Sequence, residues 1–336
     1  MSISEGAASG ARSVRSNSTG SGRFRVFSTA HGKTDVGRQR DHNEDDLLID
    51  PDCNLFAVFD GMGGNNAGEV ASALGTRSLR NFFQATQNAP LQGDEADEDL
   101  PPAARRLVMG VRKANADIFE ISSTHLEHRG MGSTIVAMHV GREDGKAHIA
   151  HVGDSRCYRV RDGVIEQLTR DHSLISDALA WNPNLTKEEL ARLPRNIISR
   201  ALGLRRTVEI DVLSEPLRPG DLFLLCSDGL SGMLSDPQIL ELVLLSDDLP
   251  EACDNLVALA NEAGGTDNIT ALMVRIQAEG PLPIGAAPAE GPSAQETKTK
   301  KDPVSIRTTA TTACPFCGKE PLEDESYCGH CGAKIV

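Results

Sequence analysis

Four aspartates that lie far apart in the chain each stand next to an apolar run. The four are Asp60 after LFAVF, Asp154 in HVGDSR after AHIA, Asp228 after LFLLCS, and Asp267 in GGTDN before ITALMV. Taken singly, each is a turn signal. An unpaired charge is expensive to bury at the end of an apolar strand, but several carboxylates that converge can share cations, because Mg²⁺ and Mn²⁺ prefer oxygen ligands. The set therefore indicates the metal centre of a hydrolase.

The C-terminus carries a second group of candidate metal ligands, two Cys-x2-Cys pairs. Ten residues separate Cys314-Pro-Phe-Cys317 from Cys328-Gly-His-Cys331. This is the spacing of a zinc ribbon, in which four thiolates surround one Zn²⁺, while a redox dithiol and disulfides are the alternatives. Because so short a segment cannot bury a core of its own, Zn²⁺ would supply its folding energy. We expect such a module to dock a protein partner.

Short apolar runs predict the strands that must position these residues. The predicted strands are FRVFSTA, LFAVFD, STIVAMHV, AHIAHV, CYRV and LFLLCS, and CYRVRDGVIEQL predicts a hairpin that turns at Asp162-Gly163. Apolar residues at helical spacing predict helices over residues 107–121 and 252–263, the second ended by Gly264-Gly265. Asp236-Pro237 predicts the start of another helix. Helix pairs between groups of strands suggest two facing sheets flanked by helices.

Composition narrows the class of protein. The chain has 336 residues and a formal net charge of −14, which argues against a nucleic-acid-binding surface. No apolar run reaches the ~18 residues of a membrane span, and the N-terminus has no apolar signal segment. We therefore expect no membrane or nucleic-acid partner and a cytoplasmic location. Cys53, Cys157, Cys226 and Cys253 have no paired spacing, which predicts reduced core residues.

Low-complexity segments suggest the domain boundaries. Residues 1–22 are rich in Ser, Gly and Arg and predict a disordered tail, with a phosphorylated or binding tail as the alternative. Residues 278–313 are dense in Pro, Ala, Gly and Thr, which predicts a flexible linker before the ribbon at 314–336. The globular domain would then span residues 23–277, with the acidic run at 93–99 as a solvated loop.

Several motifs occur in a fixed order between Phe24 and Ile276. They are TDVGRQRDHNED, VFDGMGG, MGSTIV, HVGDSR, SRALG, CSDGL and GGTDNIT. In this order they resemble the bacterial type of the metal-dependent protein phosphatases, the PPM family or type-2C class. The resemblance implies an α+β fold, the four-layer α-β-β-α sandwich, which periodicity alone does not select.

The resemblance also implies a role for each motif aspartate. Asp60 would bridge two Mn²⁺ or Mg²⁺ ions, and the carbonyl of Gly61 would complete one coordination shell directly or through water. Asp228 and Asp267 would hold the other ion, and Asp154 would bind a third, weaker one. A water activated by the paired ions would attack the phosphoryl group.

The first motif supplies three further candidates. Glu44 and Asp45 match the acidic pair that fixes metal-bound waters in the family, and a surface acidic cluster is the alternative for them. Arg40 matches the family's phosphate-binding arginine, whose planar guanidinium can hold two oxygens at once, and Arg38 competes with it. Met62 stands where animal members carry a histidine. The general acid is therefore open between a metal-bound water and another histidine.

Together these features predict a phosphoserine/phosphothreonine protein phosphatase that reverses the action of a Ser/Thr protein kinase. The alternatives are a phosphatase of anti-sigma-factor antagonists, a catalytically weak phosphoprotein-binding module, and a protein whose main function lies in its ribbon. The intact set of motif aspartates speaks against the binding module. In the family, the region matching residues 171–198, which hold the only tryptophan, Trp181, is a flap that influences substrate choice.

Overall fold

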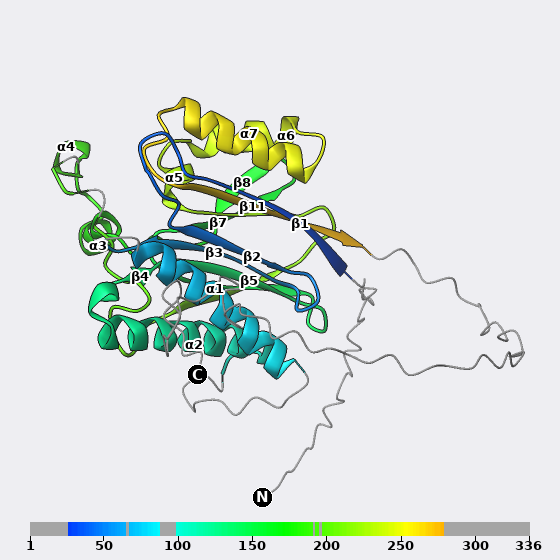
Figure 1. The fold of residues 1–336 in the computed structure, drawn as a ribbon. Coiled ribbons are helices and arrows are strands. Elements are labelled where there is room, and N and C mark those ends of the chain that lie inside the picture. Colours follow the sequence, from blue (N-terminus) through cyan, green and yellow to red (C-terminus); the bar gives the residue numbers. More distant parts are fainter. Residues whose placement is uncertain (1–25, 65–66, 88–98, 191, 195–196, 279–336) are drawn as a thin grey trace, which may run out of the picture.

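Two antiparallel sheets face each other, and helices cover both outer sides (Figure 1). The computed structural model describes residues 26–278 apart from 65–66, 88–98, 191 and 195–196. Within them the predicted four-layer α+β sandwich is the observed arrangement. The predicted tail at 1–22, the ribbon at 314–336, the linker from residue 279 and residues 93–98 of the acidic run lie outside the described residues.

The first sheet has the strand order β1-β11-β10-β7-β8. Its strands are β1 (Val26–Asp35), β11 (Ile269–Ala278), β10 (Leu222–Cys226), β7 (Arg156–Arg161) and β8 (Val164–Gln167). Strands β1 and β11 pair along their whole length, with Asp35 opposite Ile269. The loop that follows β1 therefore lies beside the turn that precedes β11.

The second sheet has the strand order β2-β3-β5-β6-β9, with the short β4 beside β3. Its strands are β2 (Asp45–Asp50), β3 (Leu55–Met62), β4 (Gly132–Ser133), β5 (Ile135–Gly141), β6 (Lys146–Val152) and β9 (Asp211–Pro216). The run STIVAMHV thus breaks at Thr134, whose N–H donates to the carbonyl of Asp60 at 2.8 Å. The apolar runs do not predict β2 and β9, because both are rich in acidic residues and β9 is a partly exposed edge strand.

Helices α1 and α2 cover the second sheet, and α6 and α7 cover the first (Figure 1). The helices are α1 (Ala67–Thr86), α2 (Pro102–Thr124), the 3₁₀ turn η2 (Leu126–His128), α3 (Leu174–Trp181), α4 (Lys187–Leu190), α5 (Asp228–Ser231), α6 (Asp236–Leu245) and α7 (Leu249–Glu262). The three predicted helices are confirmed as α2, α6 and α7. Gly264 and Gly265 follow α7 with φ of +136° and +51°, as expected for residues that end a helix.

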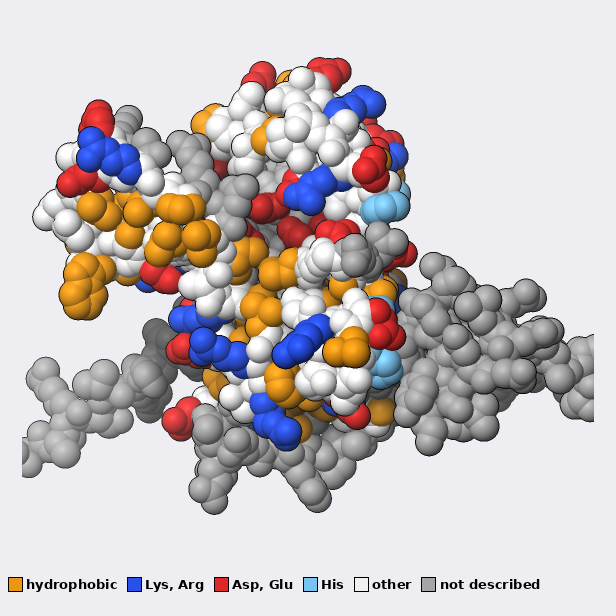
Figure 2. All heavy atoms as spheres, turned by 60° about the vertical axis from the view of Figure 1, so that its left-hand side comes forward, with side chains coloured by type: hydrophobic (Ala, Val, Ile, Leu, Met, Phe, Trp, Pro, Cys, Tyr) orange, Lys and Arg blue, Asp and Glu red, His pale blue; other side chains and the backbone are white. Residues whose placement is uncertain are grey.

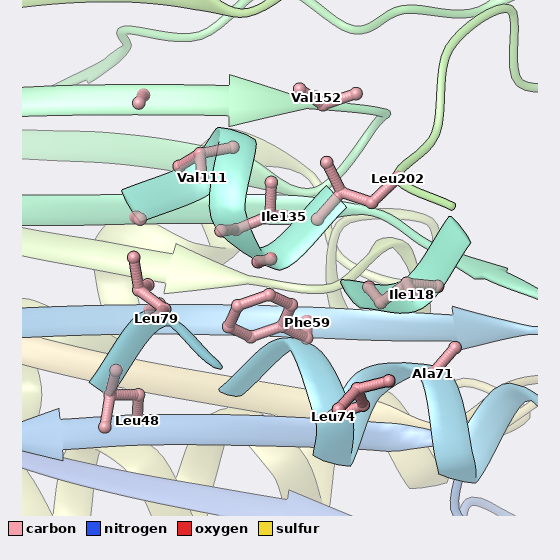
Figure 3. Packing of buried hydrophobic residues seen from close by; sticks show 14 of the residues in the cluster. Leu48, Phe59, Ala71, Leu74, Leu79, Val111, Ile118, Ile135, Val152 and Leu202 are labelled. Atoms are coloured by element: carbon pink, nitrogen blue, oxygen red, sulfur yellow. The ribbon is translucent and has the colours of Figure 1, made fainter. Parts of the chain in front are cut away.

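Apolar side chains fill each of the three spaces between the four layers. Phe56, Val136 and Phe223 belong to the cluster between the sheets. A second cluster lies under α1 and α2, where Figure 3 shows Phe59 surrounded by side chains that include Leu79 and Ile118. A third lies under α6 and α7. The rigid double sheet holds the strand ends, and hence the motif aspartates, in place.

Two smaller predictions are also confirmed. The β7–β8 hairpin turns at Asp162 and Gly163, whose φ values of +53° and +75° fit a two-residue primed turn. The four scattered cysteines of the domain are buried and unpaired. Of the helices described, none has the length and apolar character to cross a membrane.

Candidate active site

The motif aspartates meet at one edge of the double sheet. Asp60 lies near the end of β3, directly opposite Asp45 at the start of β2. Asp228 begins α5 just after β10, Asp267 lies just before β11, and Asp154 follows β6. Figure 2 shows acidic side chains gathered near the middle of this face of the molecule. Strands of both sheets therefore deliver the carboxylates to one place.

Burial and mutual repulsion raise the pKa values of Asp45, Asp60, Asp154 and Asp228. Burial raises the pKa of Asp60 well above its usual range, and the negative charges of the other four aspartates raise it further. Burial likewise raises the pKa of Asp45 and of Asp154 to about 7, with Asp228 adding to both. The pKa of Asp228 is raised by burial and then by Asp267. Such a group is stable in its ionised form only with positive charge among its members.

Asp45 is anchored on one side and free on the other. Its Oδ2 accepts hydrogen bonds from the hydroxyls of Ser227 and Thr270, each at 2.7 Å. Its Oδ1 is buried without a hydrogen-bond partner, and so is Oδ1 of Asp154. Buried carboxylate oxygens left without donors are the atoms that a hard divalent cation, or its water, would use. The donor set therefore fits Mn²⁺ or Mg²⁺.

Glu44 and Gly61 form the tightest part of this edge. The N–H of Gly61 donates to the carbonyl of Glu44 at 3.0 Å, and the Glu44 carboxylate accepts from the N–H of Gly68 in the first turn of α1. A Cβ on Gly61 would lie 2.1 Å from the carbonyl oxygen of Gly68. Only glycine fits here, because any side chain would push α1 away from the acidic group.

Arg40, rather than Arg38, reaches the acidic group with its side chain. Nη2 of Arg40 donates to Oδ2 of Asp267 at 2.7 Å. Arg38 contacts the turn before β11 through its backbone, whose N–H donates to the carbonyl of Gly265 at 2.7 Å. The guanidinium of Arg40 thus lies at the rim of the carboxylates.

Comparisons with known proteins agree with this geometry. Residues 35–272 match the family model described as protein phosphatase 2C. The chain belongs to the protein phosphatase 2C family. A serine/threonine phosphatase stp of Listeria monocytogenes is 37% identical over 249 residues, which cover 73% of this chain and 94% of the relative. The PstP phosphatase of Mycobacterium tuberculosis is 36% identical over 246 residues, 73% of this chain and 44% of that protein.

Solved structures show the same fold. The crystal structure of Mycobacterium tuberculosis PstP/Ppp aligns with a TM-score of 0.64 at 33% identity, covering 74% of this chain and 99% of that one. The catalytic domain of PstP, solved in complex with two manganese ions, aligns with a TM-score of 0.62 at 31% identity, covering 75% and 99%. Family, relatives and structures together make this chain a metal-dependent serine/threonine protein phosphatase.

The region predicted as a flap begins directly behind the phosphatase site. The N–H of Gly153, next to Asp154, donates to Nδ1 of His172 at 3.1 Å. The carboxylate of Asp171 accepts hydrogen bonds from Nε and Nη2 of Arg156. From there the chain enters α3, and a cavity of about 310 Å³ opens between α3 and β9. Trp181, at the end of α3, is 92% exposed.

His151, His172 and Asp211 form a second group with metal-ligand spacing, which no sequence motif predicted. Nδ1 of His151 is buried without a partner, but the hydrogen bonds of His172 and Asp211 do not favour a metal. Nδ1 of His172 accepts the Gly153 N–H, so its Nε2 carries the proton when the ring is neutral and has no lone pair to offer. Arg200 donates to Asp211 at 2.7 Å and supplies the positive charge. This group therefore ties both ends of the predicted flap region, at His172 and Arg200, to β9.

Three polar residues of the site were not singled out from the sequence. They are Ser227 and Thr270, which hold Asp45, and Asn268, which accepts the N–H of Glu44. The signal in the sequence was a polar residue close to a motif aspartate: Ser227 precedes Asp228, Asn268 follows Asp267, and Thr270 lies two positions further on. In the structure all three are at most 4% exposed. A buried polar side chain beside a charged group needs a partner.

Proposed function

We propose that the five converging aspartates form the centre that hydrolyses phosphoserine and phosphothreonine in protein substrates. The observation that carries this proposal is the pair of buried, unpartnered oxygens on Asp45 and Asp154. They lie in a group in which burial and repulsion raise the pKa values of Asp45, Asp60, Asp154 and Asp228. Divalent cations held there would supply water activation and charge neutralisation for phosphoryl transfer.

Each residue then has a separate role. Asp60, central to the group, would bridge two cations with help from the Gly61 carbonyl. Asp228 and Asp267 would hold the second cation, and Asp154 would bind a third. We place Glu44 and Asp45 in the outer shell, where their hydrogen bonds to Gly68, Ser227 and Thr270 would fix how they orient water.

Arg40 would hold the phosphate. Its guanidinium lies at the rim of the carboxylates, on the open side of the site, and is paired with Asp267. A planar guanidinium can bind two phosphate oxygens and stabilise the charge that develops on them. Met62 has no proton to donate, so the leaving oxygen must be protonated by water or by a histidine elsewhere.

The decisive experiment compares the native chain with Asp60→Asn on a phosphothreonine peptide with Mn²⁺. We expect the native enzyme to release phosphate and EDTA to abolish the release. The variant should lose most of its turnover and, compared without any divalent cation, keep the native melting temperature. Near-native turnover of Asp60→Asn would remove Asp60 from the centre. Tight phosphopeptide binding without phosphate release by the native chain would favour the phosphoprotein-binding module instead.

The C-terminal cysteines suggest a separate docking function. Cys314, Cys317, Cys328 and Cys331 lie outside the described residues, and their spacing is the support for a structural Zn²⁺. We propose that this zinc ribbon recruits a protein partner, either a phosphorylated substrate or the Ser/Thr protein kinase whose action the phosphatase reverses. Zinc analysis of the intact chain under reducing conditions tests the metal, and a partner screen with and without residues 279–336 tests the docking.

A further inference from the structure

The side chain of Asn268 is 4% exposed, and both ends of its amide bind the loop between β1 and β2. Its Nδ2 donates to the carbonyls of Val36 at 2.9 Å and His42 at 2.8 Å. Its Oδ1 accepts the N–H of Glu44 at 2.8 Å. One amide therefore fixes both ends of residues 36–44.

Arg40 lies at the centre of this loop. The first half of the loop is also held by backbone hydrogen bonds, because the N–H groups of Arg38 and Gln39 donate to the carbonyl of Gly265. Gly37 lies so close to the turn that a Cβ there would be 2.2 Å from the carbonyl oxygen of Asp267. After residue 39, Asn268 supplies the hydrogen bonds that connect the backbone of the loop to this turn.

We propose that Asn268 is a positioning residue for phosphate binding, which it controls by holding the loop that carries Arg40. The inference rests on the proposed role of Arg40. The backbone N–H of Asn268 donates to Oδ1 of Asp267 at 2.8 Å, so one residue sets the position of the phosphate-binding loop relative to a metal-binding carboxylate. An error of about 1 Å in such a relationship can reduce turnover by about a hundredfold.

The three hydrogen bonds to the loop require the side-chain amide of an asparagine at position 268. The loop presents two carbonyls that require donors and one N–H that requires an acceptor. Asparagine offers two N–H donors and a carbonyl oxygen on one short side chain, whereas ionised aspartate has no donor and serine has a single hydroxyl. Removal of the side chain leaves three part-buried backbone groups without these partners, and the loop would shift to satisfy them with water.

The chain offers a closely matched control. Asn115 on α2 is 2% exposed, donates from Nδ2 to the carbonyls of Arg205 and Arg206 at 3.2 and 3.1 Å, and accepts the N–H of Gly203 at 2.9 Å. It makes the same three kinds of bond to a loop that carries none of the motif aspartates. Asn115→Ala should therefore lower the melting temperature much as Asn268→Ala does, without the kinetic effect.

The test is a double-mutant cycle on the full-length protein with a phosphothreonine peptide and Mn²⁺. Arg40→Ala, Asn268→Ala, the double variant and Asn115→Ala are compared for kcat/KM, melting temperature and Mn²⁺ affinity by calorimetry. We expect Asn268→Ala to lower kcat/KM by about tenfold to a hundredfold with unchanged Mn²⁺ affinity. The double variant should be no more than about threefold worse than Arg40→Ala, because Asn268 acts through the arginine. Asn115→Ala should stay within about threefold of the native kcat/KM.

Additive losses in the double variant, or native kcat/KM in Asn268→Ala, would overturn the inference. If Asn268→Ala does not fold, Asn268→Ser takes its place in the cycle, since a hydroxyl can fill only one of the three bonds and should still couple to Arg40. Native kinetics in Arg40→Ala alone would instead refute the phosphate-binding role of Arg40. The two failures are thus distinguishable.

Discussion

Nη2 of Arg40 lies 2.7 Å from Oδ2 of Asp267, so the proposed phosphate-binding cation is paired with a proposed metal ligand. The two side chains are 47% and 34% exposed. An ion pair this open to solvent contributes about 0–1 kcal/mol. Phosphate can therefore displace the carboxylate from the guanidinium at little cost, and the pair keeps Arg40 at the site until substrate arrives.

Arg40→Ala should lower kcat/KM for a phosphothreonine peptide by about tenfold or more, mainly through KM, without weakening Mn²⁺ binding. The arginine contacts phosphate, and its loss removes a positive charge that competes for Asp267. Arg40→Lys should recover only part of the loss, because a lysine cannot bind two oxygens in one plane. Steady-state kinetics and Mn²⁺ calorimetry measure both effects, and weaker Mn²⁺ binding in either variant would place Arg40 in the metal centre instead.

Thr270→Val should weaken Mn²⁺ binding and lower the free energy of unfolding by about 1–3 kcal/mol. It removes one of the two hydroxyls that donate to Oδ2 of Asp45, and Thr270 is fully buried. The control is Thr34→Val, which removes the hydroxyl that pairs with Thr270 at 2.8 Å and leaves Asp45 its donor. Equal Mn²⁺ affinities in the two variants would show that the Thr270 hydroxyl does not support the centre.

The raised pKa values predict how metal and pH act together on stability. Asp45 and Asp154 have folded pKa values of about 7, above the ordinary value of 3.8. The metal-free folded protein therefore binds more protons than the unfolded chain between these values, and its free energy of unfolding falls as pH rises through about 7. Mn²⁺ should reverse this loss, so it should raise the melting temperature more at pH 8 than at pH 6.

Buried histidines do not disturb this comparison. Burial lowers the pKa of His139 to about 4 and also lowers the pKa of His148, His151 and His172. They act in the opposite direction, since stability that depends on their neutral form is lost as pH falls below ~6.5. Melting curves with Mn²⁺ and with EDTA at the same pH cancel their contribution. The same Mn²⁺-induced shift at pH 6 and pH 8 would contradict the prediction.

Motif aspartates could be read from the sequence because each combines a charge with the end of an apolar strand. Helix α1 could not, because Gly68 and Gly75 suggest a break in the helix. The structure explains both glycines, since a Cβ on Gly75 would lie 2.6 Å from the ring of Phe59 and one on Gly68 would lie 2.5 Å from the carboxylate of Glu44. Helix α1 lies so close to β3 and to Glu44 that only glycine fits at these two positions.

The hydrogen-bond network around the aspartates was equally hidden. Ser227 and Thr270 serve Asp45 across 182 and 225 residues of sequence, and Asn268 reaches Glu44 across 224. Such partners depend on the pairing of β1 with β11 and of β10 with β11, which local patterns do not specify. The motif aspartates could therefore be predicted from the sequence. Their hydrogen-bond partners come from distant segments and could be identified only from the folded structure.

Truncation after Ala278 should keep activity on small phosphopeptides and abolish zinc binding. The cut belongs after Ala278 because β11 pairs with β1 as far as Ala278, which lies opposite Val26. All proposed ligands of the hydrolytic metals lie upstream of it, and the four ribbon cysteines lie downstream. The measurement pairs zinc content with kcat/KM for the truncated and full-length chains on one peptide.

A matched full-length variant, Cys314→Ser with Cys317→Ser, should lose zinc and keep peptide hydrolysis, because the thiolates hold Zn²⁺ and not the catalytic cations. If either change abolishes hydrolysis of a small phosphopeptide, the ribbon and the phosphatase site are not independent.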